Sequence, residues 1–176
     1  MQPYYEDDLV TLYHGDSLDV LADLTHGSVA AVITDPPYIL HAGSAGTKGG
    51  KVGGWADMMN ASAWYSAWYR LAKTAMRADG SMWTMGNWRS IPVLLRAAMD
   101  ADLAVSSMLV WDKDWIGPAG PQGLRSQHEI CLVMPGGAAW KQPDRSQGDV
   151  LRIRASSSKP SGHPAEKPPA LMARLL

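Results

Sequence analysis

The tetrapeptide Asp35-Pro36-Pro37-Tyr38 contains the residues of this sequence that are best suited to chemistry. An exocyclic amine of adenine or cytosine is a poor nucleophile because its lone pair is delocalised into the ring, so a catalyst must localise that lone pair. The Asp35 carboxylate and the Pro36 carbonyl offer two acceptors for the two amino hydrogens. Both prolines have a fixed φ and no N–H, which stiffens the turn and keeps competing donors away. Tyr38 offers a flat face for a base taken out of the duplex stack.

The stretch before the tetrapeptide predicts where it lies in a fold. Residues 29–34 form a short apolar, β-branched run, which is typical of a buried parallel strand. In open α/β sheets, ligands bind beyond the carboxyl ends of the strands. We therefore expect the tetrapeptide at a ligand-binding edge. The alternative is an ordinary proline turn, which four residues alone do not exclude.

The rest of the chain alternates between strand and helix patterns. Ser17 is the expected cap of a first helix, whose leucines recur at helical spacing. Further helices are expected from Asn60 or Ser62 to Asp79-Gly80, over 91–101, and from Pro168. The expected strands are 9–13, 29–34, 81–85, 105–111 and 129–134. This order predicts an α/β fold, a mostly parallel Rossmann-like sheet flanked by helices, in one domain over 1–176.

Two segments interrupt this pattern. Residues 39–57 are rich in glycine, and we expect a mobile loop there, the alternative being a plain linker. Residues 135–162 are polar and irregular. From residue 36 onward the chain holds 16 basic residues against 10 acidic ones, a balance of +6 within a net charge of −1. Such a balance favours a phosphate backbone as a partner, although many ordinary surfaces carry as much charge.

Composition excludes several classes of protein. The 176 residues are 46% hydrophobic and 19% charged, as in an ordinary soluble domain. No apolar run approaches the roughly 20 residues of a membrane span, and the acidic start is no secretory signal. We therefore expect a cytoplasmic protein. Eight Trp, six Tyr and no Phe would suit stacking on bases, but a compositional bias of the lineage explains them equally well.

Cysteine and histidine usage excludes two further chemistries. Carbon-5 methylation of cytosine needs a cysteine nucleophile, but the single cysteine, Cys131, lies in an apolar strand pattern and is expected in the core. A zinc-dependent base deaminase needs paired cysteines, which one cysteine cannot supply. The five histidines are scattered without ligand spacing, so we predict no metal site.

Five segments, taken in order, resemble the amino-group DNA methyltransferases, which methylate N6 of adenine or N4 of cytosine. The segments are 13–18 with 32–38, 77–83 with 86–89, 109–113, 128–130, and 163–168. Their order is similar to that of the circularly permuted β group, in which the catalytic half precedes the cofactor half. The resemblance spans residues 9–176. It implies a methyltransferase fold that uses S-adenosylmethionine.

The resemblance implies roles for individual residues. The catalytic or base-holding residues are Asp35, Pro36, Pro37 and Tyr38. The cofactor-binding residues are Asp16, Asp35, His163, Lys167 and Pro168. The candidate DNA contacts are Lys48, Lys51, Arg145, Arg152, Arg154 and Lys159, the last four in the region where the family places target recognition. Plainer alternatives stay open: Asp16 as a helix cap, Lys167 as a solvated lysine, and the basic residues as a solvated loop.

The expected reaction is direct methyl transfer from S-adenosylmethionine to an amino group of DNA. Adenine is preferred over cytosine because an Asp-first tetrapeptide is commoner in the adenine enzymes of the family. The expected partner is double-stranded DNA, and a second copy or a restriction endonuclease are further candidates. The alternatives are an inactive DNA-binding remnant and an RNA or protein methyltransferase.

The sequence departs from the family at its end. After the segment 163–168, the family continues through a helix and a strand to a glycine-rich cofactor loop, and no such loop follows here. Three explanations compete: a fragment of a longer protein, a truncated gene, or a second chain that supplies the missing half. We expect weak or absent cofactor binding by the chain alone. Leu171, Met172 and Leu175 are expected to lack cover and to favour self-association.

Overall fold

The computed structural model describes residues 2–39, 58–117, 124–155, 162–163 and 165–175. The strands are β1 (Tyr5–Glu6), β2 (Thr11–Leu12), β3 (Val29–Thr34), β4 (Met76–Gly86), β5 (Ser107–Asp112), β6 (His128–Pro135) and β7 (Val150–Arg152). The helices are α1 (Ser17–Asp23), α2 (Met58–Ala75), α3 (Ile91–Asp100) and α4 (Pro169–Leu175). Among these helices, none is both long and apolar enough to cross a membrane.

Five strands form the central sheet in the order β3-β4-β6-β5-β7. β3 is parallel to β4 and β5 is parallel to β7, whereas β6 is antiparallel to both of its neighbours. Four of these strands therefore run in one direction and β6 runs against them. The predicted α/β fold is confirmed, and the reversed strand in the interior of the sheet is a feature that the sequence pattern did not indicate.

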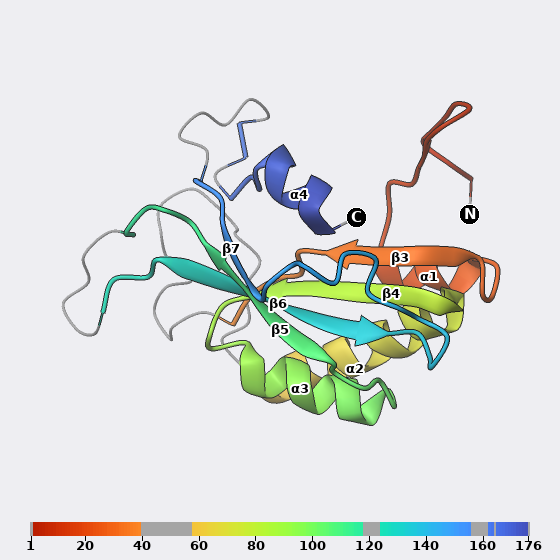
Figure 1. Cartoon of the computed structure of the whole chain (residues 1–176). Coiled ribbons are helices and arrows are strands. Elements are labelled where there is room, and N and C mark those ends of the chain that lie inside the picture. The colour runs from red at the N-terminus through yellow and green to blue at the C-terminus, as the bar shows by residue number, and fades with distance from the viewer. Residues whose placement is uncertain (1, 40–57, 118–123, 156–161, 164, 176) are drawn as a thin grey trace.

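One face of the sheet is covered by helices. In Figure 1, α2 and α3 lie below the sheet, and α1 packs against α2. Alternate side chains of a strand point to the same face of a sheet, and Ile130, Leu132 and Met134 of β6 are all buried between the sheet and these helices. From α2, Tyr65 and Tyr69 are completely buried in the same core. This layer is the larger of the two cores and makes the sheet a rigid platform.

The opposite face carries a smaller core under α4. The intervening residues of β6, Cys131 and Val133, point into it, together with Trp83 of β4. α4 closes this layer with Leu171 and Leu175, which are 0% and 3% exposed. The expectation that Leu171, Met172 and Leu175 lack cover is therefore wrong, because the second face of the sheet buries the two leucines and Met172 packs, partly buried, against the same cluster.

The N-terminal segment differs from the sequence prediction. The strand expected at 9–13 is only β2, and it pairs with β1 in a separate antiparallel hairpin instead of joining the central sheet. The hairpin projects from the body in Figure 1, and Tyr4, Leu9 and Val10 are exposed. The first helix is capped by Asp16, whose side chain accepts a hydrogen bond from the Leu18 N–H, and not by Ser17.

Two further boundaries differ. The helix expected to end at Asp79-Gly80 ends at Ala75, and β4 begins at Met76. The dipeptide lies instead in an irregular part of β4, where the pairing register with β3 shifts. The Gly80 carbonyl accepts a hydrogen bond from Gly136 N–H, and a Cβ on Gly136 would meet the Arg77 carbonyl oxygen, so glycine is needed for this close approach. The segment 135–162, expected to be irregular, contains β7.

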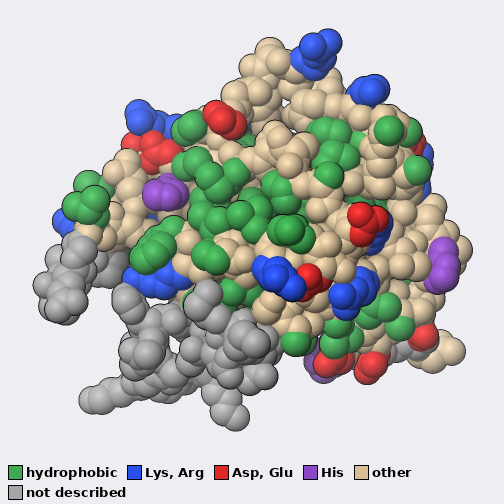
Figure 2. Space-filling view, turned by 90° about the horizontal axis from the view of Figure 1, so that it is seen from below, with side chains coloured by type: hydrophobic (Ala, Val, Ile, Leu, Met, Phe, Trp, Pro, Cys, Tyr) green, Lys and Arg blue, Asp and Glu red, His purple; other side chains and the backbone are tan. Residues whose placement is uncertain are grey.

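β3 was expected to be a buried strand, and its bounds are those predicted. It is however an edge strand of the sheet, and Ala30 and Ala31 are exposed. The helical face of the molecule also exposes apolar side chains, as Figure 2 shows from below. Leu95 and Met99 of α3 are 39% and 75% exposed. The ion pair between Arg96 and Asp100 lies on the same helix.

Candidate functional site

The tetrapeptide leaves the sheet at the carboxyl end of β3, as the sequence predicted. Its residues alternate in burial: Asp35 and Pro37 are exposed, Pro36 is buried, and Tyr38 is half-buried. The Pro37 carbonyl accepts a hydrogen bond from the Tyr65 hydroxyl of α2. This contact ties the turn to the buried helix, so the position of the Asp35 carboxylate is set by the core of the domain.

A second tie lies one residue further along. Ile39 is buried, its N–H donates to the Ser90 hydroxyl at 3.0 Å, and its carbonyl accepts from the Asn87 side chain at 2.9 Å. Asn87 also accepts from the Ser90 N–H and hydroxyl, each at 2.9 Å. Asn87 and Ser90 belong to the turn between β4 and α3, so the segment 35–39 is hydrogen-bonded on both sides by structured elements.

The Asp35 carboxylate lies in a network of charges. Its Oδ1 accepts from the Tyr38 hydroxyl at 2.7 Å, and its Oδ2 pairs with Lys167 Nζ at 2.8 Å. The Tyr38 hydroxyl is also 2.9 Å from Glu129 Oε2, which in turn is 3.2 Å from Lys167 Nζ. Lys113 Nζ completes the network at 3.5 Å from Glu129 Oε1. Two carboxylates thus bind the Tyr38 hydroxyl, Lys167 bridges these carboxylates, and Lys113 pairs with one of them.

Burial is uneven across this network. The Lys167, Lys113 and Glu129 side chains are 11%, 13% and 18% exposed, whereas Asp35 is 36% exposed. Asp35 is therefore the member of the network that a molecule from solvent can reach. Burial, with the nearby charges of Glu129 and Asp35, raises the pKa of Tyr38 far above its ordinary value, so Tyr38 stays a hydrogen-bond donor. Burial also raises the pKa of Tyr65.

The predicted cofactor residues are brought together only in part. Lys167 reaches Asp35, and the buried Pro168 begins α4 by accepting from the Leu171 and Met172 N–H groups. The exposed His163 accepts from the Ala165 N–H through Nδ1. Asp16 caps α1, and within the described residues no hydrogen bond or ion pair joins it to the others. Of the predicted cofactor residues that the structure describes, Lys167 is therefore placed at the tetrapeptide by an ion pair.

The predicted DNA contacts are also scattered. Arg145 and Arg154 are exposed, and Arg152 of β7 is exposed but pairs with Asp112 Oδ2 at 2.9 Å. Lys48, Lys51 and Lys159, and the glycine-rich segment after Ile39, lie outside the described residues. The three described arginines share the stretch from 145 to 154, which crosses the far edge of the sheet through β7.

Comparison with known proteins agrees with this arrangement. A family profile described as DNA methylase, for N6 and N4 methyltransferases, matches residues 29–176. The chain belongs to this DNA methylase family. It is similar to the type II methyltransferase M2.LlaDCHI of Lactococcus lactis subsp. cremoris, with 26% identity over 120 residues, which is 64% of this chain and 45% of that protein.

Solved structures share the methylase fold. PvuII DNA methyltransferase, described as cytosine-N4-specific, aligns with a TM-score of 0.63 and 16% identity over 85% of this chain and 58% of its own. The M1.HpyAVI–SAM complex aligns with a TM-score of 0.62 and 19% identity over 93% of this chain and 74% of its own. The chain spans 45% of the length of the first curated relatives that it matches.

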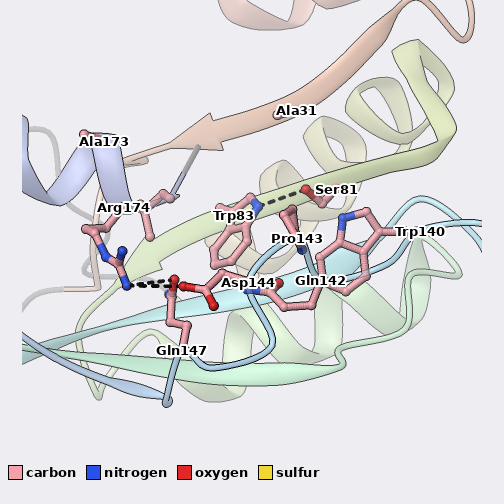
Figure 3. Close-up of a pocket in the computed structure, with 11 residues that line it drawn as sticks. Ala31, Ser81, Trp83, Trp140, Gln142, Pro143, Asp144, Gln147, Ala173 and Arg174 are labelled. Atoms are coloured by element: carbon pink, nitrogen blue, oxygen red, sulfur yellow. Dashed lines mark hydrogen bonds and ion pairs between the residues drawn. The ribbon is translucent and has the colours of Figure 1, made fainter.

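The methylase chain also has a cavity away from Asp35. It encloses about 170 Å³ between the end of α4, β4 and the segment 140–147, and no residue of the tetrapeptide lines it. Figure 3 shows Trp83 and Trp140 beside it, with Trp83 bonded to Ser81 and Arg174 near Gln147 and Asp144. It is separate from the network at Asp35, so the two are different features of the molecule.

Cys131 lies in β6 as the sequence predicted. Its side chain is 0% exposed, and burial, with the charge of Asp35, raises the pKa of its thiol to about 12. A thiol that is buried and protonated at neutral pH is not a nucleophile. This supports the exclusion of a carbon-5 mechanism in this methylase.

Sequence reasoning missed five residues that surround the tetrapeptide: Glu129, Lys113, Tyr65, Asn87 and Ser90. Glu129 had one available signal, since a glutamate inside an apolar strand pattern is rarely buried without a partner. Asn87, Lys113 and Glu129 also lie in the segments 86–89, 109–113 and 128–130 that resemble the family, but no role was assigned to them. Tyr65 and Ser90 lie in a helix and a turn, and nothing in their local pattern sets them apart.

Proposed function

We propose that this chain carries the base-binding side of a DNA methyltransferase that transfers a methyl group to the exocyclic amine of adenine. The observation that supports it is the Asp35 carboxylate, exposed at the carboxyl end of β3 and held by Tyr38 and Lys167. S-adenosylmethionine, present in the M1.HpyAVI complex, would supply an electrophilic methyl group. The chain spans less than half the length of its first relatives, so the methyl transfer by the whole protein is proposed here.

The tetrapeptide acts on the amine through two acceptors. Asp35 keeps a lone pair on each oxygen after bonding Tyr38 and Lys167, so it can still accept from an amino hydrogen. In the described part of the chain, no donor occupies the Pro36 carbonyl, which can accept from the second hydrogen. Two such bonds localise the lone pair of the amine. After the transfer the nitrogen is positive, and Asp35 is placed to take its proton.

Tyr38 and the arginines supply the rest of the substrate contacts in this proposal. The Tyr38 ring is the platform for a base taken out of the duplex, and its hydroxyl is already bonded, so the ring has a fixed plane. Arg145, Arg152 and Arg154 would neutralise phosphates of the duplex. The matched structures do not decide between adenine and cytosine, because they include a cytosine-N4 enzyme. We choose adenine because the tetrapeptide begins with Asp.

Transfer of labelled methyl groups tests the proposal. The chain is incubated with millimolar S-adenosylmethionine and, in parallel, with DNA, RNA or protein, and the DNA is then digested to nucleosides. We expect label in N6-methyladenine. Label in N4-methylcytosine would correct the base, and label only in RNA or protein would contradict the substrate class. DNA binding without any transfer would favour the inactive DNA-binding remnant.

Cofactor affinity is a separate test. Because no hydrogen bond or ion pair joins Asp16 to Lys167 within the described residues, we expect weak binding of S-adenosylmethionine to this chain. Calorimetric titration at fixed pH measures it, and micromolar affinity would contradict the expectation. A second copy and a restriction endonuclease stay predictions for the partners, and the names of the type II relatives bear on the endonuclease alone.

A further inference from the structure

Glu129 is the member of the network around Asp35 that lies within a strand of the sheet. It lies on β6, which pairs with β4 on one side and β5 on the other, so its backbone is fixed in the interior of the sheet. Its side chain is 18% exposed and reaches the edge at which β3 ends. A carboxylate in this position is costly to bury unless it is paired, and its partners determine what it does.

The partners of Glu129 come from three separate parts of the chain. Tyr38 follows β3, Lys113 follows β5, and Lys167 precedes α4. Glu129 contacts all three, at 2.9, 3.5 and 3.2 Å. Neither Tyr38 nor Lys167 lies in a strand or helix. Their contacts with the Glu129 carboxylate therefore fix their positions relative to the sheet.

The geometry also gives Tyr38 and Lys167 a fixed relation to each other. The Tyr38 hydroxyl is held between Asp35 and Glu129, which sets the direction of the ring axis. Lys167 Nζ bridges the same two carboxylates and lies 5.3 Å from the centroid of the Tyr38 ring. Without the Glu129 side chain, both groups would be bonded to Asp35 alone, the carboxylate that the substrate amine must use.

We propose that Glu129 is a positioning residue for amino-group methylation: it holds the Tyr38 ring and the Lys167 ammonium so that Asp35 remains available to the base. The inference rests on the proposed function. Glu129 does not touch the substrate. It takes up hydrogen-bonding and charge that would otherwise fall on Asp35, and it does so from a strand that cannot move without breaking the sheet.

The decisive variant is Glu129→Gln, which keeps the shape and one acceptor oxygen but removes the charge. In the methyl-transfer assay we expect kcat to fall at least about tenfold, with KM for DNA changed less than about threefold, since Glu129 contacts Tyr38 and Lys167 and does not itself bind DNA. Glu129→Asp, which keeps the charge, should recover part of kcat. Asp79→Asn is the matched control, because it also removes a paired carboxylate, the partner of Arg77 at 2.6 Å.

A second measurement does not depend on activity. The Cζ resonance of Tyr38, assigned in ¹³C-tyrosine-labelled chain by its loss in Tyr38→Phe, reports the hydrogen bonds of the hydroxyl. Glu129→Gln should shift this resonance more than those of the other five tyrosines, and Asp79→Asn should leave it unchanged. If Glu129→Gln does not fold, Glu129→Asp takes its place, with a smaller shift in the same resonance.

The outcomes separate the inference from the function on which it rests. An unchanged Tyr38 resonance in folded Glu129→Gln, or wild-type kcat, overturns the positioning role. A wild-type chain that methylates no DNA contradicts the proposed function, and the resonance then decides alone whether Glu129 holds Tyr38. A shifted resonance together with the loss of kcat and a retained KM supports both.

Discussion

Two tyrosine–aspartate hydrogen bonds in this molecule have the same length and different surroundings. Tyr5 donates to Asp7 at 2.7 Å in the N-terminal hairpin, and Tyr38 donates to Asp35 at 2.7 Å after β3. In the hairpin, Asp7 also accepts from the Leu9 and Val10 N–H groups of its own turn. At β3, the pair is joined by Lys167 and by Glu129, ninety-one residues from Tyr38.

The difference shows what turns a common local contact into a candidate for chemistry. The hairpin bond is exposed, and its Asp7 has a pKa lowered by the Tyr5 hydroxyl and by the two backbone N–H groups. The bond at β3 is fixed from several elements, and its tyrosine is kept protonated by burial. Two hydrogen bonds of equal length are therefore expected to differ in their contributions to activity and to stability.

The largest contrast is expected in activity. Asp35→Ala should lower methyl transfer at least about 100-fold, as expected when one preorganised polar group is removed from a reaction centre. Asp7→Ala removes the matching carboxylate of the hairpin and should leave the rate unchanged. Label transfer to DNA measures both, and full activity of Asp35→Ala would end the proposed mechanism.

The next contrast is in stability. Lys167→Met leaves two neighbouring carboxylates, Asp35 and Glu129, without their shared cation, and we expect a loss of about 2 kcal/mol in the free energy of unfolding. Arg96→Met breaks the exposed pair with Asp100 and should cost no more than about 0.5 kcal/mol. Urea unfolding monitored by Trp fluorescence compares them. Equal losses would mean that the network contributes nothing beyond a surface ion pair.

Alkaline pH should separate the two tyrosines. The unfolded chain loses the Tyr38 proton near pH 10, whereas the folded chain keeps it because burial raises the pKa. The contribution of Tyr38 is therefore present below about pH 10 and falls by up to about 1.4 kcal/mol per pH unit above it. Unfolding of wild type and Tyr38→Phe at pH 9 to 11 measures this.

Lys167 and Lys113 are present in both chains of that comparison, so the difference between wild type and Tyr38→Phe isolates the phenol. The pKa of Tyr5 is also raised, mainly by its hydrogen bond with Asp7, but the hairpin is exposed. Tyr5→Phe should therefore change the pH dependence much less. A constant difference between wild type and Tyr38→Phe across this range would contradict the burial of the Tyr38 proton.

The smallest contrast concerns the tie to α2. Tyr65→Phe removes the hydroxyl that the Pro37 carbonyl accepts from, and should cost about 1 kcal/mol. Hydrogen exchange should also quicken at the Ile39 N–H, the next bonded amide. Tyr5→Phe removes an exposed hydroxyl bond and should change the free energy of unfolding by less than about 0.5 kcal/mol. Equal effects of Tyr65→Phe and Tyr5→Phe on the free energy of unfolding would mean that the tetrapeptide does not unfold together with the core.

The elements with strong local signals could be predicted from the sequence. The β-branched run that ends at Asp35-Pro36 fixed the bounds of β3, and Pro92 in a first turn marked α3. The change from α2 to β4 at Ala75 could not be located, because no glycine or proline stands there and the Asp79-Gly80 pair imitates a helix end. β2 was found, but its partner was not, since a strand pattern does not encode which edge it joins.

The candidate site divides in the same way. Asp35 and Tyr38 carry their chemistry in the local sequence, and Lys167 was found through a family resemblance. Its ion pair with Asp35, and the place of Glu129 between Tyr38 and Lys167, depend on the folded sheet. Contacts across 91 residues arise from strand order, which a single sequence does not show.

The edge position of β3 has a consequence for the behaviour of the chain in solution. β3 is six residues long, free of charge and proline, and rich in β-branched and small side chains. Within the described residues it pairs on one side only, with β4, so its other side presents a row of unsatisfied amide groups. Such an edge is a template for pairing with another strand, and the charge and prolines that can oppose this pairing lie after its end, at Asp35-Pro36-Pro37. Aggregation of the concentrated protein should therefore begin at β3, the strand that ends one residue before Asp35.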